Sequence, residues 1–231
     1  MFMDPLYLML ALPGLLLSLW ASWRTKSAFA KYSEVPSRRR ITGAEAAETM
    51  LARAGITDVK VVPADGFLSD HYNPMNKTLA LSEPVFASTS IAAVGVATHE
   101  AGHAIQHANS YGPLYLRSAL VPTANVGSTM SYIVIMLGFM LASQNLVAIG
   151  AILFSGVVLF QLVTLPVEFD ASNRAKRLVV DYGIVTADER EGIDRVLNAA
   201  AMTYVAAAVS SLLTLVYYLY RAGLLGGRRD D

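Results

Sequence analysis

Four long apolar segments constrain this chain more than any other feature. They cover residues 5–23, 126–142, 146–165 and 199–220, and about 20 mostly apolar residues are enough for one helix to span a bilayer. Only 16% of all residues are charged and 54% are hydrophobic, whereas a soluble domain carries about 25% charged residues. A single such segment also fits a buried core helix, but four in 231 residues favour a mainly α integral membrane protein with about four transmembrane helices.

The regions between these segments, residues 24–123 and 166–198, are more polar and carry most of the basic residues. Basic side chains follow the first span at Arg24, Lys26, Lys31 and 38–40, and the third span at Arg174, Lys176 and Arg177. Because basic loops stay in the cytoplasm, we expect both regions on the cytoplasmic side and the amino terminus outside. The tail, 221–231, would then lie outside, although Arg228 and Arg229 argue against this. The chain length predicts one membrane domain over 1–231.

Local signals predict a small α+β part before the second span. Thr42 and Glu45 form a capping box for a helix ending near Gly55, and strands are expected at 59–62 and 78–82. A helix is expected over 90–109. The second strand is a candidate to pair with an extended substrate at a sheet edge. Pro166 is expected to break the third span before a helix over 168–182, and Thr186 with Glu189 to cap the next helix.

The segment His99-Glu100-Ala101-Gly102-His103 matches H-E-x-x-H. Residues i and i+4 share one face of a helix, so both imidazoles can reach one metal ion, and Glu100 is suited to deprotonate a metal-activated water. The chain has 4 histidines and no cysteine, so the other ligands must offer nitrogen or oxygen. The motif predicts a Zn²⁺ site with His99 and His103 as ligands.

A catalytic zinc needs a third protein ligand. His107 follows His103 by one turn, but eight residues separate it from His99, about 12 Å along a helix, so it cannot share the ion. Glu168 is our choice, because a two-span hairpin goes out and returns at this residue. Asp170 and Asp181 are the competing carboxylates, and a surface carboxylate beside Arg174 is the structural alternative for Glu168.

Several stretches together resemble the bacterial, membrane-associated neutral zinc metallopeptidases of the YugP-like family. They are residues 42–47 (TGAEAA), 68–74 (LSDHYNP), 79–82 (LALS), 96–106 (VATHEAGHAIQ) and 165–172 (LPVEFDAS). More distantly, the chain is similar to membrane zinc proteases of the CAAX-processing and heat-shock HtpX type, whose third ligand is a glutamate at the position of Glu168. Those proteases have an aspartate four residues later, where this chain has Ser172, and Asp170 is the candidate substitute.

The resemblance implies a gluzincin-like zinc endopeptidase in the bacterial inner or plasma membrane, with its active site facing the cytoplasm. Glu100 is expected to act as general base. His71 and Tyr72 are candidate donors to the developing oxyanion; alternatively, Asp70 and Asn73 shape a turn in which His71 packs. The expected partners are a peptide or protein substrate, membrane proteins included, and the lipid bilayer. The net charge of +0 predicts no nucleic-acid partner. The competing functions are a non-catalytic metal-binding membrane scaffold and a metal transporter.

Overall fold

The computed structural model describes residues 4–66 and 69–225, so Leu68, Arg228 and Arg229 lie outside the described residues. The chain packs as two compact units. We call the first the membrane unit (Met1–Trp20, Leu116–Leu165 and Thr203–Asp231) and the second the site unit (Ala21–Tyr115 and Pro166–Met202).

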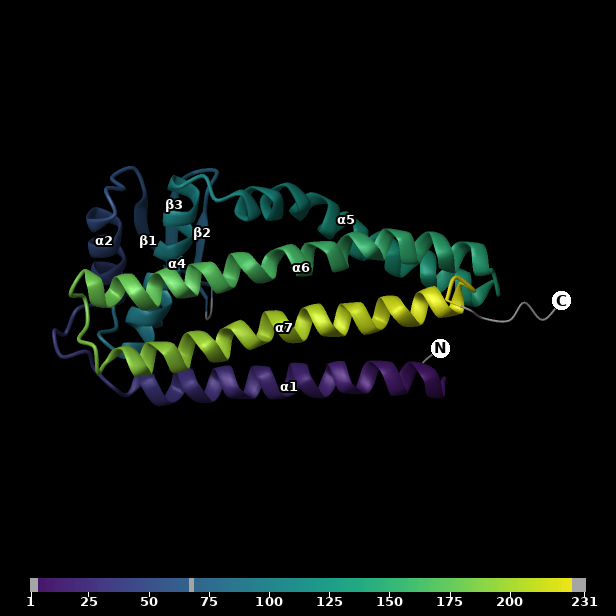
Figure 1. The fold of residues 1–231 in the computed structure, drawn as a ribbon, viewed down its shortest axis with the longest axis horizontal. Helices are drawn as coiled ribbons and strands as arrows, with labels where there is room; N and C mark the ends of the chain where they lie inside the picture. Colours follow the sequence, from purple (N-terminus) through teal and green to yellow (C-terminus); the bar gives the residue numbers. More distant parts are fainter. Residues whose placement is uncertain (1–3, 67–68, 226–231) are drawn as a thin grey trace. The chain divides into compact units, whose positions relative to one another are not determined.

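Four helices are long and apolar enough to cross a membrane: α1 (Pro5–Ser33), α5 (Gly112–Met140), α6 (Gln144–Asp181) and α7 (Arg190–Arg221). Three of them contain a predicted segment whole, and α5 covers 126–140 of the segment predicted over 126–142. The prediction of a mainly helical membrane protein is confirmed. The helices extend beyond the apolar segments, and all four continue into residues of the site unit. Figure 1 shows α1, α6 and α7 as long continuous helices and α5 as a bent one.

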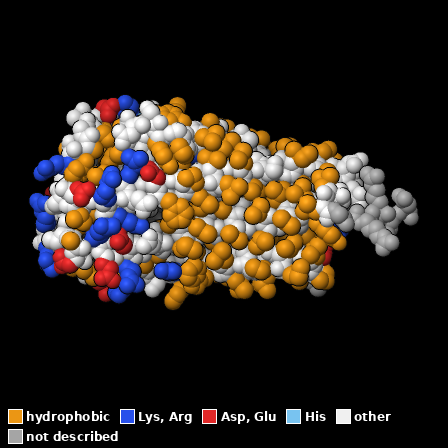
Figure 2. All heavy atoms as spheres, in the orientation of Figure 1, with side chains coloured by type: hydrophobic (Ala, Val, Ile, Leu, Met, Phe, Trp, Pro, Cys, Tyr) orange, Lys and Arg blue, Asp and Glu red, His pale blue; other side chains and the backbone are white. Residues whose placement is uncertain are grey.

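The membrane unit packs through aromatic and small residues. Tyr217 is fully buried, with its ring 5.1 Å from Tyr7 of α1. Gly150 of α6 meets Ile135 of α5 so closely that a Cβ would lie 2.3 Å from the Ile135 side chain. Large apolar side chains remain exposed around this core, and Figure 2 shows hydrophobic side chains covering the visible face of the unit. Such a surface suits a lipid environment.

The site unit also contains short helices and a three-stranded sheet. These elements are α2 (Gly43–Arg53), β1 (Lys60–Ala64), β2 (His71–Asn73), β3 (Thr78–Ser82), α3 (Glu83–Phe86) and α4 (Ile91–Ala108). The capping box of Thr42 and Glu45 is confirmed at the start of α2. Buried residues of α2, β3, α4, α6 and α7 share one hydrophobic core, among them Met50, Leu79, Val94, Val179 and Ile193. Charged side chains gather over this unit in Figure 2.

Two local expectations are wrong. The strand order is β1-β3-β2, with β3 parallel to β1 and antiparallel to β2. Strand β3 is therefore central, and both of its edges are already hydrogen-bonded, so it cannot pair with a substrate. Pro166 does not interrupt α6, which runs unbroken from Gln144 to Asp181. A proline removes one backbone donor, and a long membrane helix tolerates this loss when neighbouring groups compensate.

Candidate metal site

Helix α4 presents two histidines on one face. Ser90 caps its start, with the hydroxyl accepting a hydrogen bond from the Ala93 N–H at 3.2 Å. The helix is buried along most of its length, because small and apolar residues surround the polar ones. His99 and His103 are one turn apart, and their rings pack edge to face with centroids 4.8 Å apart.

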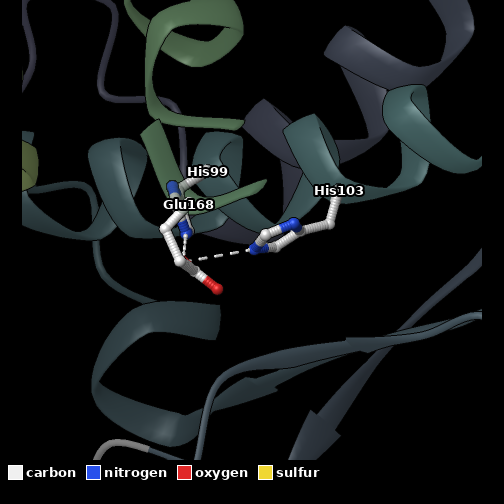
Figure 3. Close-up of side chains that lie close together, drawn as sticks. All are labelled: His99, His103 and Glu168. Carbon is white, nitrogen blue, oxygen red and sulfur yellow. Dashed lines mark ion pairs between the residues drawn. The ribbon is translucent and has the colours of Figure 1, made fainter. Parts of the chain in front are cut away.

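Helix α6 brings Glu168 to the same point. One carboxylate oxygen, Oε2, lies 3.3 Å from His99 Nε2 and 3.6 Å from His103 Nε2. Figure 3 shows the three side chains pointing toward one another. The three ligand atoms lie within 4.8 Å of one another, and the Glu168 side chain is only 2% exposed. Residues 99, 103 and 168 thus meet within the site unit, as the hairpin argument predicts.

The spacing of these atoms fits a tetrahedral zinc ion. With zinc–ligand bonds of about 2.1 Å, two ligand atoms of a tetrahedral site stand about 3.4 Å apart. The measured Nε2–Oε2 distances of 3.3 and 3.6 Å bracket that value. Two neutral imidazoles and one carboxylate are also the donors of a catalytic zinc site with one open position. The residues therefore fit the metal that the motif predicts.

Each histidine has its own partner on the other ring nitrogen. Ser172 Oγ lies 3.2 Å from His99 Nδ1, and Gln106 Oε1 lies 3.0 Å from His103 Nδ1. These contacts leave both Nε2 atoms directed at Glu168. Sequence reasoning missed Gln106, and the available signal was an amide side chain one turn after His103. It noted Ser172 only as a departure, although this hydroxyl reaches His99 directly.

The site favours a positive charge. Burial by itself lowers the pKa of His103, but the hydrogen bond to Glu168 and the negative charges of Glu100 and Glu168 outweigh burial and raise that pKa above its ordinary value. A proton on the imidazole and a cation between the ligands benefit from the same negative field. The electrostatics therefore agree with the donor geometry.

Glu100 lies beside the first histidine on α4 and is 8% exposed. Among residues 4–66 and 69–225, none donates a hydrogen bond to its carboxylate. Both oxygens of this carboxylate are therefore free of donors from the described protein groups.

Gly102 allows the two helices that carry these side chains to approach each other. A Cβ on Gly102 would lie 2.7 Å from the carbonyl oxygen of Ala171 and 3.3 Å from its Cα. The first distance is shorter than real Cβ contacts and ends on a backbone atom, so only glycine fits at this position without a shift of the backbone. The glycine between the two histidines thus has a packing reason that the motif alone does not reveal.

The other predicted residues lie outside the group of three. Tyr72 OH lies 2.8 Å from His107 Nδ1, and His71 Nδ1 lies 2.7 Å from the Ser69 carbonyl. Asp170 contacts Gln106 and Arg174 rather than a histidine, so it does not take the place of Ser172. Asp181 is exposed at the end of α6.

The alternative in which Asp70 and Asn73 shape a turn around His71 holds only for Asn73, because His71 is exposed on β2 and Asp70 binds Ser82 at the end of β3. Asp70 accepts hydrogen bonds from the Ser82 N–H and hydroxyl, and Asn73 accepts one from the Met75 N–H. Neighbouring residues of a strand point to opposite faces, so His71 and Tyr72 of β2 do not share a face of the sheet. Transition-state stabilisation by either one stays a prediction.

Comparison with known proteins agrees with this arrangement. The sequence model of the family described as "Putative neutral zinc metallopeptidase" matches residues 7–223. The chain is also 47% identical over 226 residues to the "Putative membrane protease YugP" of Bacillus subtilis (strain 168), covering 98% of this chain and 100% of that protein. No solved structure matches. Both matches run through every element that carries His99, His103 and Glu168, and the chain therefore belongs to the neutral zinc metallopeptidase family that this sequence model describes.

Proposed function

We propose that this protein is a zinc-dependent membrane endopeptidase, with His99, His103 and Glu168 as the zinc ligands and Glu100 as the general base. The observation that carries the proposal is the placement of two imidazole Nε2 atoms 3.3 and 3.6 Å from one buried carboxylate oxygen. A structural zinc is normally closed by four protein ligands. In the described residues the group contains three, which favours a site with an open position.

A zinc ion held by His99, His103 and Glu168 would lower the pKa of a water molecule toward about 7 and would polarise the peptide carbonyl. In this proposal Glu100 accepts a proton from a water molecule while the oxygen of that water attacks the carbonyl carbon. Glu100 then delivers this proton to the amide nitrogen, and the carbon–nitrogen bond breaks. His71 and Tyr72 remain the candidate donors to the oxyanion. The outer strands β1 and β2, in place of β3, are the candidates to pair with an extended substrate.

The proposed site faces the cytoplasm. One compact unit contains both residues 21–115 and residues 166–202, which supports placing the two predicted water-facing regions on the same side of the bilayer. Both carry the basic clusters that follow the first and third spans. By the positive-inside rule that side is the cytoplasm, and the substrates are peptides or proteins reachable from it.

Glu100→Gln in the purified full-length protein tests the proposal. General-base catalysis contributes about 10²–10⁴-fold, so we expect hydrolysis of an unstructured protein such as casein to fall by that factor. Zinc bound per protein, measured by atomic emission, should not change. Glu48→Gln on the exposed face of α2 is the matched control. Full hydrolysis by Glu100→Gln would exclude the proposed role of the glutamate.

A further inference from the structure

We propose that Gln106 is the positioning residue of the metal site, which holds the His103 ring and the Glu168 segment of α6 in a fixed relation. This inference rests on the proposed zinc site and adds a determinant of its geometry. Gln106 is on α4, one turn after His103, and its side chain is completely buried.

Every polar group of the Gln106 amide is used. Its Nε2 donates to the Val167 carbonyl at 2.8 Å and to Asp170 Oδ2 at 2.8 Å. Its Oε1 lies 3.0 Å from His103 Nδ1. Val167 and Asp170 flank Glu168 in the sequence. One amide therefore binds both a candidate ligand on α4 and the segment of α6 that carries the third candidate ligand.

The surroundings decide which way the amide faces. A backbone carbonyl and a carboxylate oxygen can only accept hydrogen bonds, so the NH₂ group must face Val167 and Asp170. The amide oxygen is then left for His103, and Nδ1 must carry the hydrogen of that bond. With Nδ1 protonated, the lone pair of His103 lies on Nε2, the atom that faces Glu168. Partners of this kind fix the ring orientation and tautomer of metal-binding histidines.

The far end of this chain of contacts is also fixed. Asp170 Oδ2 forms an ion pair with Arg174 one turn later on α6, where the two side chains are 29% and 22% exposed. The Arg174 guanidinium lies 5.7 Å from the Tyr111 ring centroid. Asp170 is thus held by a second contact, and the Gln106 amide is not free to rotate.

Among the described residues, His99 has no amide partner of this kind. Its Nδ1 partner is the Ser172 hydroxyl at 3.2 Å, and a hydroxyl can donate or accept. This contact does not impose one tautomer, nor does it connect His99 to the backbone of α6. We therefore expect that substitution of Gln106 lowers metal affinity more than substitution of Ser172 does.

Gln106→Met tests the inference, because methionine fills a similar volume without hydrogen-bonding groups that replace the amide. Loss of such a partner typically lowers metal affinity about 10–100-fold. Zinc affinity of the full-length protein in detergent, measured by chelator competition, should fall by this factor. Thr98→Val is the matched control. Thr98 is equally buried on α4 but bonds only to the Val94 and Gly95 carbonyls of its own helix, so zinc affinity should not change.

A conservative variant and a spectrum separate positioning from packing. Gln106→Glu keeps the side-chain volume and an acceptor for His103 Nδ1, but it puts a carboxylate oxygen in place of the donor to Val167 and Asp170, so the geometry of the metal ligands should change in this variant as well. With Co²⁺ in place of zinc, the visible absorption bands report ligand geometry; they should change in Gln106→Met and not in Thr98→Val. If Gln106→Met does not fold, the comparison of Gln106→Glu with wild type provides the same test.

Two results would overturn the inference alone. One is wild-type zinc affinity in Gln106→Met, and the other is a wild-type Co²⁺ spectrum in Gln106→Met or Gln106→Glu, which would assign any loss of affinity to packing. Failure of the proposed function gives a different result, because the wild-type protein itself would then bind no zinc or Glu100→Gln would still hydrolyse protein.

Discussion

His103 and His107 are one turn apart on α4, and their surroundings differ. His103 Nε2 faces the Glu168 carboxylate, and its ring is held by Gln106. His107 Nδ1 meets the Tyr72 hydroxyl at 2.8 Å, with the Tyr72 and Tyr115 rings 5.9 and 5.8 Å away. Both histidines have an oxygen partner, but only one partner is an anion.

The charge of the partner separates a metal site from a structural contact. Burial raises the pKa of Tyr72 to about 12, with smaller electrostatic contributions from Asp58 and Tyr115. The Tyr72 hydroxyl is therefore neutral at physiological pH. A neutral phenol and one imidazole offer a cation little, whereas Glu168 supplies a full negative charge between two imidazoles. Histidine spacing alone does not make this distinction.

The largest expected effect comes from Glu168→Ala. Removing a direct ligand should weaken zinc binding by more than the roughly 10–100-fold typical of an outer partner, as measured by chelator competition. His107→Gln, one turn beyond His103, is the control and should bind zinc as wild type does. Unchanged zinc stoichiometry in Glu168→Ala would contradict the contrast between His103 and His107, and the third ligand would then be Asp170 or another residue.

Gly102→Ala should act on the same region through packing. Alanine gains about 1 kcal/mol of helix propensity over glycine, but overpacking costs about 1–3 kcal/mol or more. The methyl group would be 2.7 Å from the backbone oxygen of Ala171, which cannot yield like a flexible side chain. We expect lower thermal stability and weaker zinc binding.

Gly112→Ala is the matched control, because nothing lies within 4 Å of a Cβ added there. Its stability should stay near that of wild type. If Gly102→Ala were as stable as Gly112→Ala, the close approach of α4 and α6 would not constrain the site.

The sequence predicts the local parts of this site well. The helix expected over 90–109 is observed as Ile91–Ala108, because Ser90 is a good capping residue and the apolar pattern is strong. The juxtaposition of Glu168 with the histidines followed from counting membrane crossings. Gln106 could not be assigned its role in this way, since Val167 and Asp170 come from 61 and 64 residues away. The central place of β3 was equally hidden, because a strand's own pattern does not encode its neighbours.

The pH dependence of zinc binding should follow His103. Its pKa lies above the ordinary value of 6.5, and a protonated imidazole cannot bind metal. Below that raised pKa, displacing one proton should weaken apparent zinc affinity about tenfold per pH unit, or about 1.4 kcal/mol. Chelator competition at several pH values measures this. Affinity that is constant through this range would contradict the assignment of His103 as a ligand.

The folding stability of the metal-free protein should change with pH in the direction opposite to zinc affinity. A raised folded-state pKa contributes stability that is fully present below the unfolded value of about 6.5 and is lost as pH rises through the folded value. Thermal unfolding of the metal-free protein should therefore show His103 stabilising the fold at the acid end of this window, where zinc binding is weakest.

Tyr72→Phe gives the smallest expected effect and bears most directly on the contrast between the two histidines. If the hydroxyl serves His107, its removal costs one partly buried hydrogen bond, about 0.5–1.5 kcal/mol of stability, and leaves kcat unchanged. Thermal unfolding and protein hydrolysis measure the two quantities on the same preparation. A fall in kcat of about 10²–10³-fold, the usual cost of losing an oxyanion donor, would instead give Tyr72 the catalytic role that its sequence position suggested. The contact between Tyr72 and His107 of α4 would then be part of the active site.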